Sequence, residues 1–367
     1  MKKILFLMAM ACCMVACQND DTDFSAYTDG TATHVIQITY NGNSVTVTGD
    51  DKGYVSKDGA DVLVNAQDND SLLLVLSGTT TDGSLLVLRE KKYGIQLKGV
   101  SITNSDGPAI NNQCGKSLYL EIADGTVNTL TDGTTYDESV NYQQKGALFS
   151  EGQIFFSGSG ALTVTGNCKN AIASDDYIVI SGSPVITAHS STGHGIKVND
   201  GLWINGGTLD IKVTADAARG IKSDSVVVIT AGDITINTTG DCIYDEAESD
   251  YSSAACIKCE DPFTMSGGTL TMKSSGDGGK GINCADKVTL TGGTLSAITT
   301  GSSEDGKPKA VKGDKGIVLS GGSFYAKVDK SWACDNGTDS DDATARVTVV
   351  GNPPTDIRTK KEVKVVF

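Results

Sequence analysis

Apolar and polar positions follow a pattern that returns about every 25 residues from Gly146 to about Val328. Each copy holds an apolar triplet, an acidic turn, a strand-like run, a Gly-Gly-Thr-like corner and a second strand-like run, as in HGIKVNDGLWINGGTLDI from His194. The central residues of the triplets are 24, 24, 25, 36, 25 and 29 residues apart and are Leu148, Ile172, Ile196, Ile221, Ile257, Ile282 and Val311. A fixed period of this length predicts a solenoid.

The inside of one repeat indicates which solenoid it is. Ile221, residues 226–229 and residues 234–236 form three short apolar or alternating runs that are rich in Val, Ile and Thr. Each run is too short for a helix, and turn residues such as Ser-Asp and Ala-Gly-Asp separate them. We therefore expect an all-β fold, a right-handed parallel β-helix with three short strands per coil of about 25 residues. A leucine-rich repeat or a propeller is disfavoured, because the consensus and the repeat length do not fit.

The β-helix is expected to span residues 34–367. Strand-like runs begin at His34 to Tyr40 and continue through 62–64, 72–76, 85–88 and 95–102, which predicts less regular N-terminal coils. The stretch with Trp332, the acidic residues 335–342 and a strand pair around 352–354 is expected to form the C-terminal cap, since terminal repeats cover the open ends of a solenoid core.

The N-terminus indicates export. Met1-Lys2-Lys3 precedes the apolar run 4–15, which is too short for a membrane span and predicts a signal peptide at residues 1–16. Met14-Val15-Ala16-Cys17 resembles a bacterial lipobox, so Cys17 is the expected lipidation site. Residues 17–33 are expected to be an acidic tether, which is similar to the export tract of Bacteroides-type surface lipoproteins; a plain flexible tether is the alternative. We expect a monomeric outer-membrane lipoprotein at the cell surface.

Composition narrows the possible partners. The chain has 43 Gly, 6% aromatic residues and a formal net charge of −15. Such a charge argues against nucleic acid and anionic membrane surfaces, because phosphate binding needs a basic footprint. A negative net charge is compatible with the binding of Ca²⁺.

Strand alternation predicts a basic column. The residue after each inward triplet centre points outward, and stacking by about 4.8 Å per coil aligns these residues. The expected column consists of Lys197, Lys222, Lys258, Asn283 and Lys312, with Tyr244 entering it from the coil that starts at Cys242. Two interpretations remain open. Either a neighbouring column of acidic turn residues neutralises the lysines, or the lysines and Arg219 receive uronate carboxylates. The acidic turn residues are Glu151, Asp175, Asp200, Asp224, Asp261, Asp286 and Asp314.

Insertions interrupt the period at residues 131–145, 244–255 and 301–309. All lie near the junction that leads into the inward-Ile strand, and loops on one edge of a repeat protein often border its binding face. Three loop aromatics could stack on sugar rings and are Tyr136, Tyr142 and Tyr251. Trp203 is expected on the second sheet face as an alternative platform.

Acidic residues in the same region suggest a Ca²⁺ site. Asp241 and Asp277 occupy equivalent coil positions and should lie close together, while Asp245 and Glu246 belong to the inserted loop. Clustered carboxylates with loop carbonyls suit Ca²⁺. A solvated acidic loop is the alternative.

Seven cysteines follow Cys17 in the chain. Cys259 and Cys284 each stand two residues after an inward Ile, so we expect them to stack inside as thiols, because a spacing of about 4.8 Å exceeds disulfide geometry. Cys242 and Cys256 bracket the acidic loop and form the one disulfide that we predict.

These residues carry a resemblance. SITNSDGPAI from Ser101, ADGTVNTLTDG from Ala123, GALFSEG from Gly146 and the iterated GIK with its GGTL corner resemble the carbohydrate-binding β-helix family known from a cellulolytic clostridium and from Bacteroides-type lipoproteins. The resemblance implies binding of cellulose and acidic sugars, assisted by Ca²⁺, without catalysis.

The expected function is therefore that of a non-catalytic cell-surface lipoprotein that binds acidic (uronate) or plant-type polysaccharides with the assistance of Ca²⁺. A Ca²⁺-dependent, pectate-type polysaccharide lyase is the first alternative, with Lys222, Lys258, Arg219 or Lys280 as the base. An adhesin or structural surface protein is the second. The repetition of the lysines along a column favours a scaffold over a catalytic centre, so we expect no enzyme activity.

Overall fold

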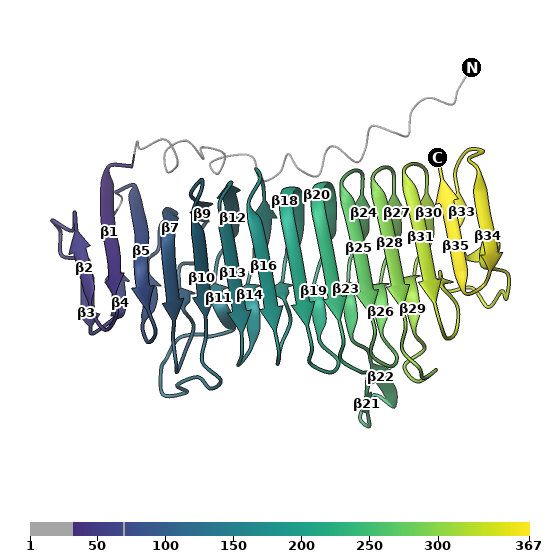
Figure 1. Cartoon of the computed structure of the whole chain (residues 1–367), viewed down its shortest axis with the longest axis horizontal. Coiled ribbons are helices and arrows are strands. Elements are labelled where there is room, and N and C mark those ends of the chain that lie inside the picture. The colour runs from purple at the N-terminus through teal and green to yellow at the C-terminus, as the bar shows by residue number, and fades with distance from the viewer. Residues whose placement is uncertain (1–31, 69) are drawn as a thin grey trace, which may run out of the picture.

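The computed structural model describes residues 32–68 and 70–367 of the chain. The expected signal peptide, the lipidation site Cys17 and nearly all of the tether lie outside these residues. The described chain is a parallel β-solenoid of about 11 turns. Figure 1 shows its coils stacked in one long row, with the N-terminal coils at one end and the C-terminal strands at the other. The described residues contain no α-helix, so the all-β prediction is confirmed.

One sheet has 12 strands, one from nearly every coil. Its strands are β3 (Val55–Asp58), β4 (Asp61–Asn65), β6 (Ser84–Leu88), β8 (Ile110–Asn112), β11 (Gly146–Ser150), β14 (Asn170–Ser174), β17 (Ile196–Val198), β19 (Arg219–Ser223), β23 (Ala255–Cys259), β26 (Lys280–Cys284), β29 (Lys309–Gly313) and β32 (Cys334–Asp335). All neighbours pair in parallel except β3 and β4, which form an antiparallel hairpin.

The second sheet has 21 strands, and in most regular coils it takes two of the three strands. Its N-terminal half consists of β1 (His34–Asn41), β2 (Val45–Thr48), β5 (Leu72–Thr80), β7 (Tyr93–Thr103), β9 (Leu118–Ile122), β10 (Val127–Thr131), β12 (Ile154–Gly158), β13 (Ala161–Gly166), β15 (Tyr177–Ile180) and β16 (Val185–Ser190). Its C-terminal half consists of β18 (Gly201–Val213), β20 (Val227–Thr238), β24 (Phe263–Met265), β25 (Thr269–Ser274), β27 (Val288–Leu290), β28 (Thr294–Thr299), β30 (Ile317–Leu319), β31 (Ser323–Val328), β33 (Thr348–Val349), β34 (Thr355–Thr359) and β35 (Glu362–Val366).

The core is a stack of identical inward positions. Leu148 pairs in register with Ile172, Ile172 with Ile196, and the series continues to Val311 through Ile221, Ile257 and Ile282. All of these side chains are buried. β-branched side chains suit such a pleated, buried surface, and their burial is the main favourable term of the fold. The predicted inward column is therefore confirmed.

Gly-Gly-Thr corners separate β24 from β25 and β27 from β28 in the larger sheet, whereas the corner at 206–208 lies within the long strand β18. Gly268 has a φ of +78° and Gly293 a φ of +81°. A Cβ at Gly268 would lie 2.6 Å from the carbonyl oxygen of Gly232 in the previous coil. Only glycine combines this left-handed backbone with such close stacking of coils, which explains the repeated motif.

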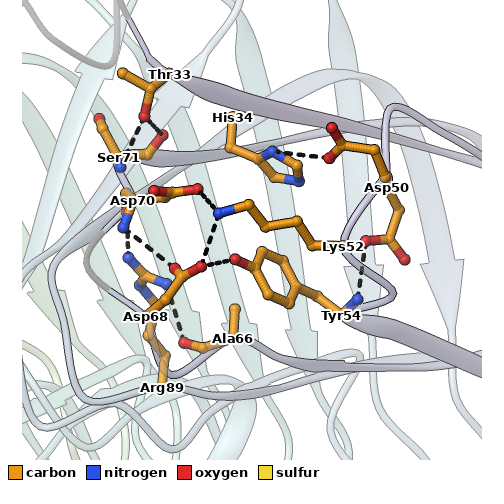
Figure 2. Close-up of polar contacts among 11 residues, drawn as sticks. Thr33, His34, Asp50, Lys52, Tyr54, Ala66, Asp68, Asp70, Ser71 and Arg89 are labelled. Atoms are coloured by element: carbon orange, nitrogen blue, oxygen red, sulfur yellow. Dashed lines mark hydrogen bonds and ion pairs between the residues drawn. The ribbon is translucent and has the colours of Figure 1, made fainter.

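A polar network lies beside the first coil (Figure 2). The Lys52 ammonium contacts the carboxylates of Asp68 and Asp70, and the Tyr54 hydroxyl donates to Asp68. Arg89 is 3% exposed and donates to the Ala66 carbonyl at 2.9 Å. The hairpins β1–β2 and β3–β4 and this network end the core at the N-terminus.

Residues that follow the last complete coil cover the other end of the solenoid. The short 3-10 helix η1 (Ala343–Arg346) follows the acidic stretch, and β35 pairs antiparallel with β31 of the last complete coil. The Arg346 guanidinium is buried and lies 3.4 Å from the centre of the Trp332 ring. Residues 353 and 354, both proline, lie in the connection between β33 and β34.

All seven described cysteines are free thiols. Cys259 and Cys284 are buried and paired in register, as expected. The predicted Cys242–Cys256 disulfide is wrong. Cys256 is fully buried, with its Sγ 3.6 Å from the Ile236 carbonyl oxygen, whereas Cys242 is half-buried before the inserted hairpin.

Among the described residues, no helix has the length and apolar character needed to cross a membrane.

Candidate functional site

The outer face of the 12-stranded sheet carries the predicted lysine column. Strand register pairs Lys197 with Lys222, Lys222 with Lys258, Lys258 with Asn283, and Asn283 with Lys312. Successive coils are about 4.8 Å apart, so these side chains form one line along the solenoid. The four lysine side chains are 23–32% exposed and are therefore accessible to solvent.

Carboxylates accompany each lysine of this column. The Nζ–carboxylate distances are 3.7 Å for Lys197–Asp224, 3.4 Å for Lys222–Asp224, 2.9 Å for Lys258–Glu260 and 2.8 Å for Lys312–Asp314. The sequence suggested Asp261 as the partner of Lys258, but Glu260 is the partner in the structure. The Asp261 carboxylate accepts a hydrogen bond from the Ser225 hydroxyl. Ion pairs this exposed contribute about 1 kcal/mol or less. The lysines are thus partly neutralised and remain able to exchange partners.

A cleft, which we call the C-terminal cleft, borders the column at β19, β23, β26 and β29. Its volume is about 610 Å³, and Lys258 and Lys312 of the column both line it. The basic side chains in its wall are Arg219, Lys258, Lys280, Lys307, Lys309 and Lys312, and the acidic ones are Asp245, Glu248, Asp250 and Asp335. Six cations therefore face four carboxylates, and the cleft is basic in a protein that is acidic as a whole.

Lys280 is the most unusual of these cations. Its side chain is 7% exposed, and its ammonium donates to the Gly306 carbonyl at 2.7 Å and to the Ser253 hydroxyl. Burial, and then the charges of Lys312 and Lys309, lower the pKa of Lys280 to about 8. Lys280 stands two residues before the inward Ile282, so strand alternation directs it to the buried side of the coil corner.

Lys309 repeats this arrangement one coil later, since it pairs in register with Lys280. It is 5% exposed, its ammonium donates to the Ser331 hydroxyl at 2.6 Å, and it lies 3.9 Å from the Asp335 carboxylate. Burial lowers the pKa of Lys309. The cleft wall therefore contains two lysine residues that are more than nine-tenths buried.

Arg219 was expected in the site and lies in the wall of the C-terminal cleft. Its Nη2 donates to the Ser252 hydroxyl at 3.0 Å and its Nη1 to the Ala217 carbonyl, while its buried Nε has no partner among the described residues. Burial lowers its pKa. The guanidinium is thus held by neutral groups, and its positive charge can interact with an anionic ligand.

The inserted residues after Cys242 form a separate hairpin of β21 (Ile243–Asp245) and β22 (Asp250–Ser252), which projects from the solenoid (Figure 1). The expectation that Tyr244 enters the lysine column is wrong, because β19 pairs directly with β23 and the insertion pairs with itself. Tyr244 is 44% exposed and packs edge-on against Tyr251 with ring centres 5.0 Å apart. Tyr251 is the hairpin tyrosine that lines the cleft.

Trp203 lies on β18 in the larger sheet, as predicted, and not in the C-terminal cleft. Its ring packs edge-on against Tyr177 at 5.6 Å, in a row that continues through Phe155 to Tyr119. Its role in ligand binding stays a prediction.

The four predicted metal ligands are spread over two places. Asp241 and Asp277 lie in neighbouring coils as expected: the Asp241 carboxylate accepts the Asp277 N–H at 2.7 Å, and the Asp277 carboxylate accepts the Ser302 N–H at 2.6 Å. Asp245 caps the hairpin turn by accepting the Ala247 N–H, and Glu246 is exposed beside it. Nowhere in residues 32–68 and 70–367 do three His, Cys, Asp or Glu side chains gather in a way that could hold a metal ion. Ca²⁺ binding stays a prediction without a preformed carboxylate cage.

Sequence reasoning considered Lys280 only as a possible base and missed Lys309 and Lys307. A signal was present, because the first strand residue of three coils is basic: Arg219, Lys280 and Lys309 each precede an inward residue by two positions. Strand alternation assigns such residues to the interior. Only the coil corner, where the strand begins, lets their charged ends reach a cleft.

Comparison with known proteins places this geometry in a family. A family model described as carbohydrate-binding domain-containing protein matches residues 58–224 and 210–306. A protein of the same description from Acetivibrio thermocellus is 33% identical over 104 residues, which are 27% of this chain and 36% of that protein. The chain therefore spans little more than a third of the length of that relative.

A solved structure has a similar fold. The polysaccharide lyase-like protein from C. thermocellum, determined as a gadolinium derivative, is similar with a TM-score of 0.56 at 26% identity over 70% of this chain and 96% of that one. This structural likeness agrees with the parallel solenoid. Because the family model covers more than half of its residues, the chain belongs to the family of carbohydrate-binding domain-containing proteins.

Proposed function

We propose that this protein is a non-catalytic carbohydrate-binding protein that holds an acidic polysaccharide in the C-terminal cleft and along the lysine column. Membership of a carbohydrate-binding family supports the general role. The observation that carries the proposal for acidic sugars is the pair of buried ammonium groups, Lys280 and Lys309, in the wall of the cleft.

Buried cations need a counter-charge. The two acceptors that Lys280 contacts, the Ser253 hydroxyl and the Gly306 carbonyl, are uncharged. Burying an ammonium group is costly without an ionic partner, and charge-assisted hydrogen bonds to a carboxylate are about twice as strong as neutral ones. A uronate carboxylate in the cleft supplies that partner, and the exposed lysines meet further carboxylates of the same chain.

The first test is the charge dependence of binding. We expect oligogalacturonate to bind more tightly than cello-oligosaccharide of equal length in calorimetric titration, with an affinity that falls as salt rises. The double substitution Lys258→Ala and Lys312→Ala should weaken oligogalacturonate binding at least tenfold. Lys273→Ala, which removes an exposed lysine from β25 in the larger sheet, is the matched control and should change little. Unchanged affinity in the double variant would show that the lysine column takes no part in binding.

A lyase is the second candidate function, and one observation favours it. A general base must be neutral to accept a proton, and the lowered pKa of Lys280, about 8, makes a neutral amine accessible at mildly alkaline pH. The structural relative is also named lyase-like. Lyase cleavage of a uronate leaves an unsaturated end that absorbs in the ultraviolet. Incubation with polygalacturonate at neutral and alkaline pH, with and without Ca²⁺, should give no such signal. A sustained signal that Lys280→Met abolishes would make the protein an enzyme.

We further propose that a lipid on Cys17 attaches the protein, as a monomer, to the outer membrane at the cell surface. The lipobox-like residues 14–17 and the acidic residues that follow support this placement.

A further inference from the structure

A second cavity lies at the N-terminal end of the same sheet face, and the proposed function does not use it. This cavity, the N-terminal pocket, has a volume of about 420 Å³ and is built on β3, β4, β6 and β8. Asn111 of β8 lines it, and five register steps along the outward column separate Asn111 from Lys258. The two cavities are therefore about 24 Å apart on one face. The volume falls within the range of about 300–1,000 Å³ for small-molecule sites.

The floor of the N-terminal pocket is apolar. Leu63 and Leu86 occupy the outward column where the C-terminal coils have lysines, and both are half-buried in the pocket. The Tyr142 ring, 36% exposed, borders the same space. Aliphatic and aromatic surfaces of this kind fit the C–H faces of a pyranose ring, and a tyrosine adds a polar tip.

The wall of the pocket is already in place. The inserted loop 131–145 is tied to the coil beneath it, because the Asp137 N–H donates to the Asp106 carbonyl at 2.8 Å. The Gln144 amide donates to the Asp137 carbonyl at 2.8 Å, and the Asn104 amide donates to the Pro108 carbonyl at 2.8 Å. A preformed wall reduces the entropy that binding must remove.

The rim of the pocket is acidic. Its carboxylates belong to Asp58, Asp61, Asp106 and Asp137. Lys57 is the one basic residue in the lining, and its ammonium donates to the Val45 carbonyl. Three negative charges are thus in excess. The pKa of the Tyr142 hydroxyl is raised by burial and then by the charges of Asp137, Asp106 and Asp61.

The negative charge of the N-terminal pocket determines which ligands can bind in it. A uronate would meet repulsion from the carboxylates, which is the reverse of the C-terminal cleft. A bare metal ion does not suit the site, since no three acidic side chains among the described residues converge to hold one. The remaining occupant is a larger cation with an apolar face, for which the carboxylates provide charge-assisted acceptors.

We propose that the N-terminal pocket binds a protonated amino sugar, with the ring on Leu63, Leu86 and Tyr142 and the ammonium group among the aspartates. The pocket thereby gives the protein a second glycan specificity, opposite in charge to that of the C-terminal cleft. This inference does not depend on uronate binding, because the two cavities share no residue.

The test compares two oligomers that differ at the nitrogen on C2, which is a protonated amine in one and a neutral acetamide in the other. Oligomers of glucosamine should bind to the full-length protein in calorimetric titration, and the matched N-acetylated oligomers, which have no ammonium group, should bind at least tenfold more weakly. The double substitution Asp61→Asn and Asp106→Asn should weaken glucosamine-oligomer binding at least tenfold, and Tyr142→Ala should weaken it several-fold. All three side chains are exposed, so the variants should fold, as an unchanged melting temperature would verify.

Asp233→Asn, an exposed aspartate of β20 in the larger sheet, is the matched control and should bind like the unmodified protein. Oligogalacturonate binding should be unaffected in the pocket variants, which separates failure here from failure of the proposed function. Equal binding of the charged and N-acetylated oligomers would mean that the pocket takes neutral sugars and would overturn the proposal. Glucosamine-oligomer binding that survives the double substitution would place it elsewhere and would overturn the proposal as well.

Discussion

Single residues in the C-terminal cleft differ in how their charge is held. The exposed lysines of the column have carboxylate partners within 4 Å, while Lys280 has a hydroxyl and a carbonyl. Because Lys280 is buried among other lysines, its charged form is destabilised in the folded protein. Protonation of Lys280 should therefore strengthen the binding of an acidic ligand and lower the stability of the folded protein.

At this scale we expect affinity for oligogalacturonate to fall as pH rises through about 8. Lys280 is protonated below its pKa of about 8 and neutral above it, whereas the uronate carboxylates stay ionised throughout. Titrations at pH 6.5 and 9.5 should show a several-fold loss of affinity that Lys280→Met removes. The unfolded chain holds more protons between pH 8 and the ordinary lysine value of 10.5, so Lys280 contributes a rise in stability with pH in that window. An identical pH profile in Lys280→Met would show that this ammonium takes no part in binding.

At the scale of elements, the hairpin β21–β22 is the structure that the period alone could not place. The insertion pairs with itself and forms one wall of the C-terminal cleft through Tyr251, Asp245 and Asp250. The hairpin carboxylates are exposed and close to the cleft. A Ca²⁺ ion bound to them would need further oxygen ligands, which loop carbonyls or a bound uronate would supply.

The element-scale prediction concerns this metal. If the hairpin carboxylates hold Ca²⁺, millimolar Ca²⁺ should raise the melting temperature relative to chelator, because a ligand that binds the native state stabilises it. The triple substitution Asp245→Asn, Glu246→Gln and Asp250→Asn should abolish the increase, and Asp233→Asn should retain it. Calorimetric titration with Ca²⁺ checks binding directly. A protein that melts at one temperature in Ca²⁺ and in chelator, with no heat of binding, has no site of useful affinity.

At the scale of the whole molecule, the solenoid distributes charge along one face. The outward column changes from Leu63 and Leu86 at the N-terminal coils to lysines from Lys197 onward. Since each coil contacts mainly its neighbours, the surface of one part can vary without disturbing the core of another. The fold thus supports two cavities of opposite charge about 24 Å apart on the same sheet.

Attachment of the whole molecule to a membrane is also testable. If Cys17 is lipidated, cells grown with a labelled fatty acid should yield labelled protein in the outer-membrane fraction. Cys17→Ala should release unlabelled protein, while Cys13→Ala should leave labelling unchanged. Protease added to intact cells should degrade the attached form if it faces outward. Labelling that survives Cys17→Ala would assign the lipid to another residue.

The sequence by itself determined the repeating part of this protein. The inward anchors from Leu148 to Val311, the lysine column and the thiol pair Cys259–Cys284 all follow from a fixed period and a two-residue alternation, because in a parallel solenoid each residue stacks on its equivalent in the next coil. These features needed no knowledge of contacts distant in the chain.

The tertiary structure decided what lies where the period breaks. It separated Cys242 from Cys256, turned Tyr244 away from the column, and brought the buried ends of Lys280 and Lys309 to a cleft. It also set Tyr142 of one insertion above leucines from coils more than 50 residues earlier. Insertions and coil corners have no repeated partner to fix their side chains, so their positions depend on packing against several coils at once, which alternation along one strand does not encode.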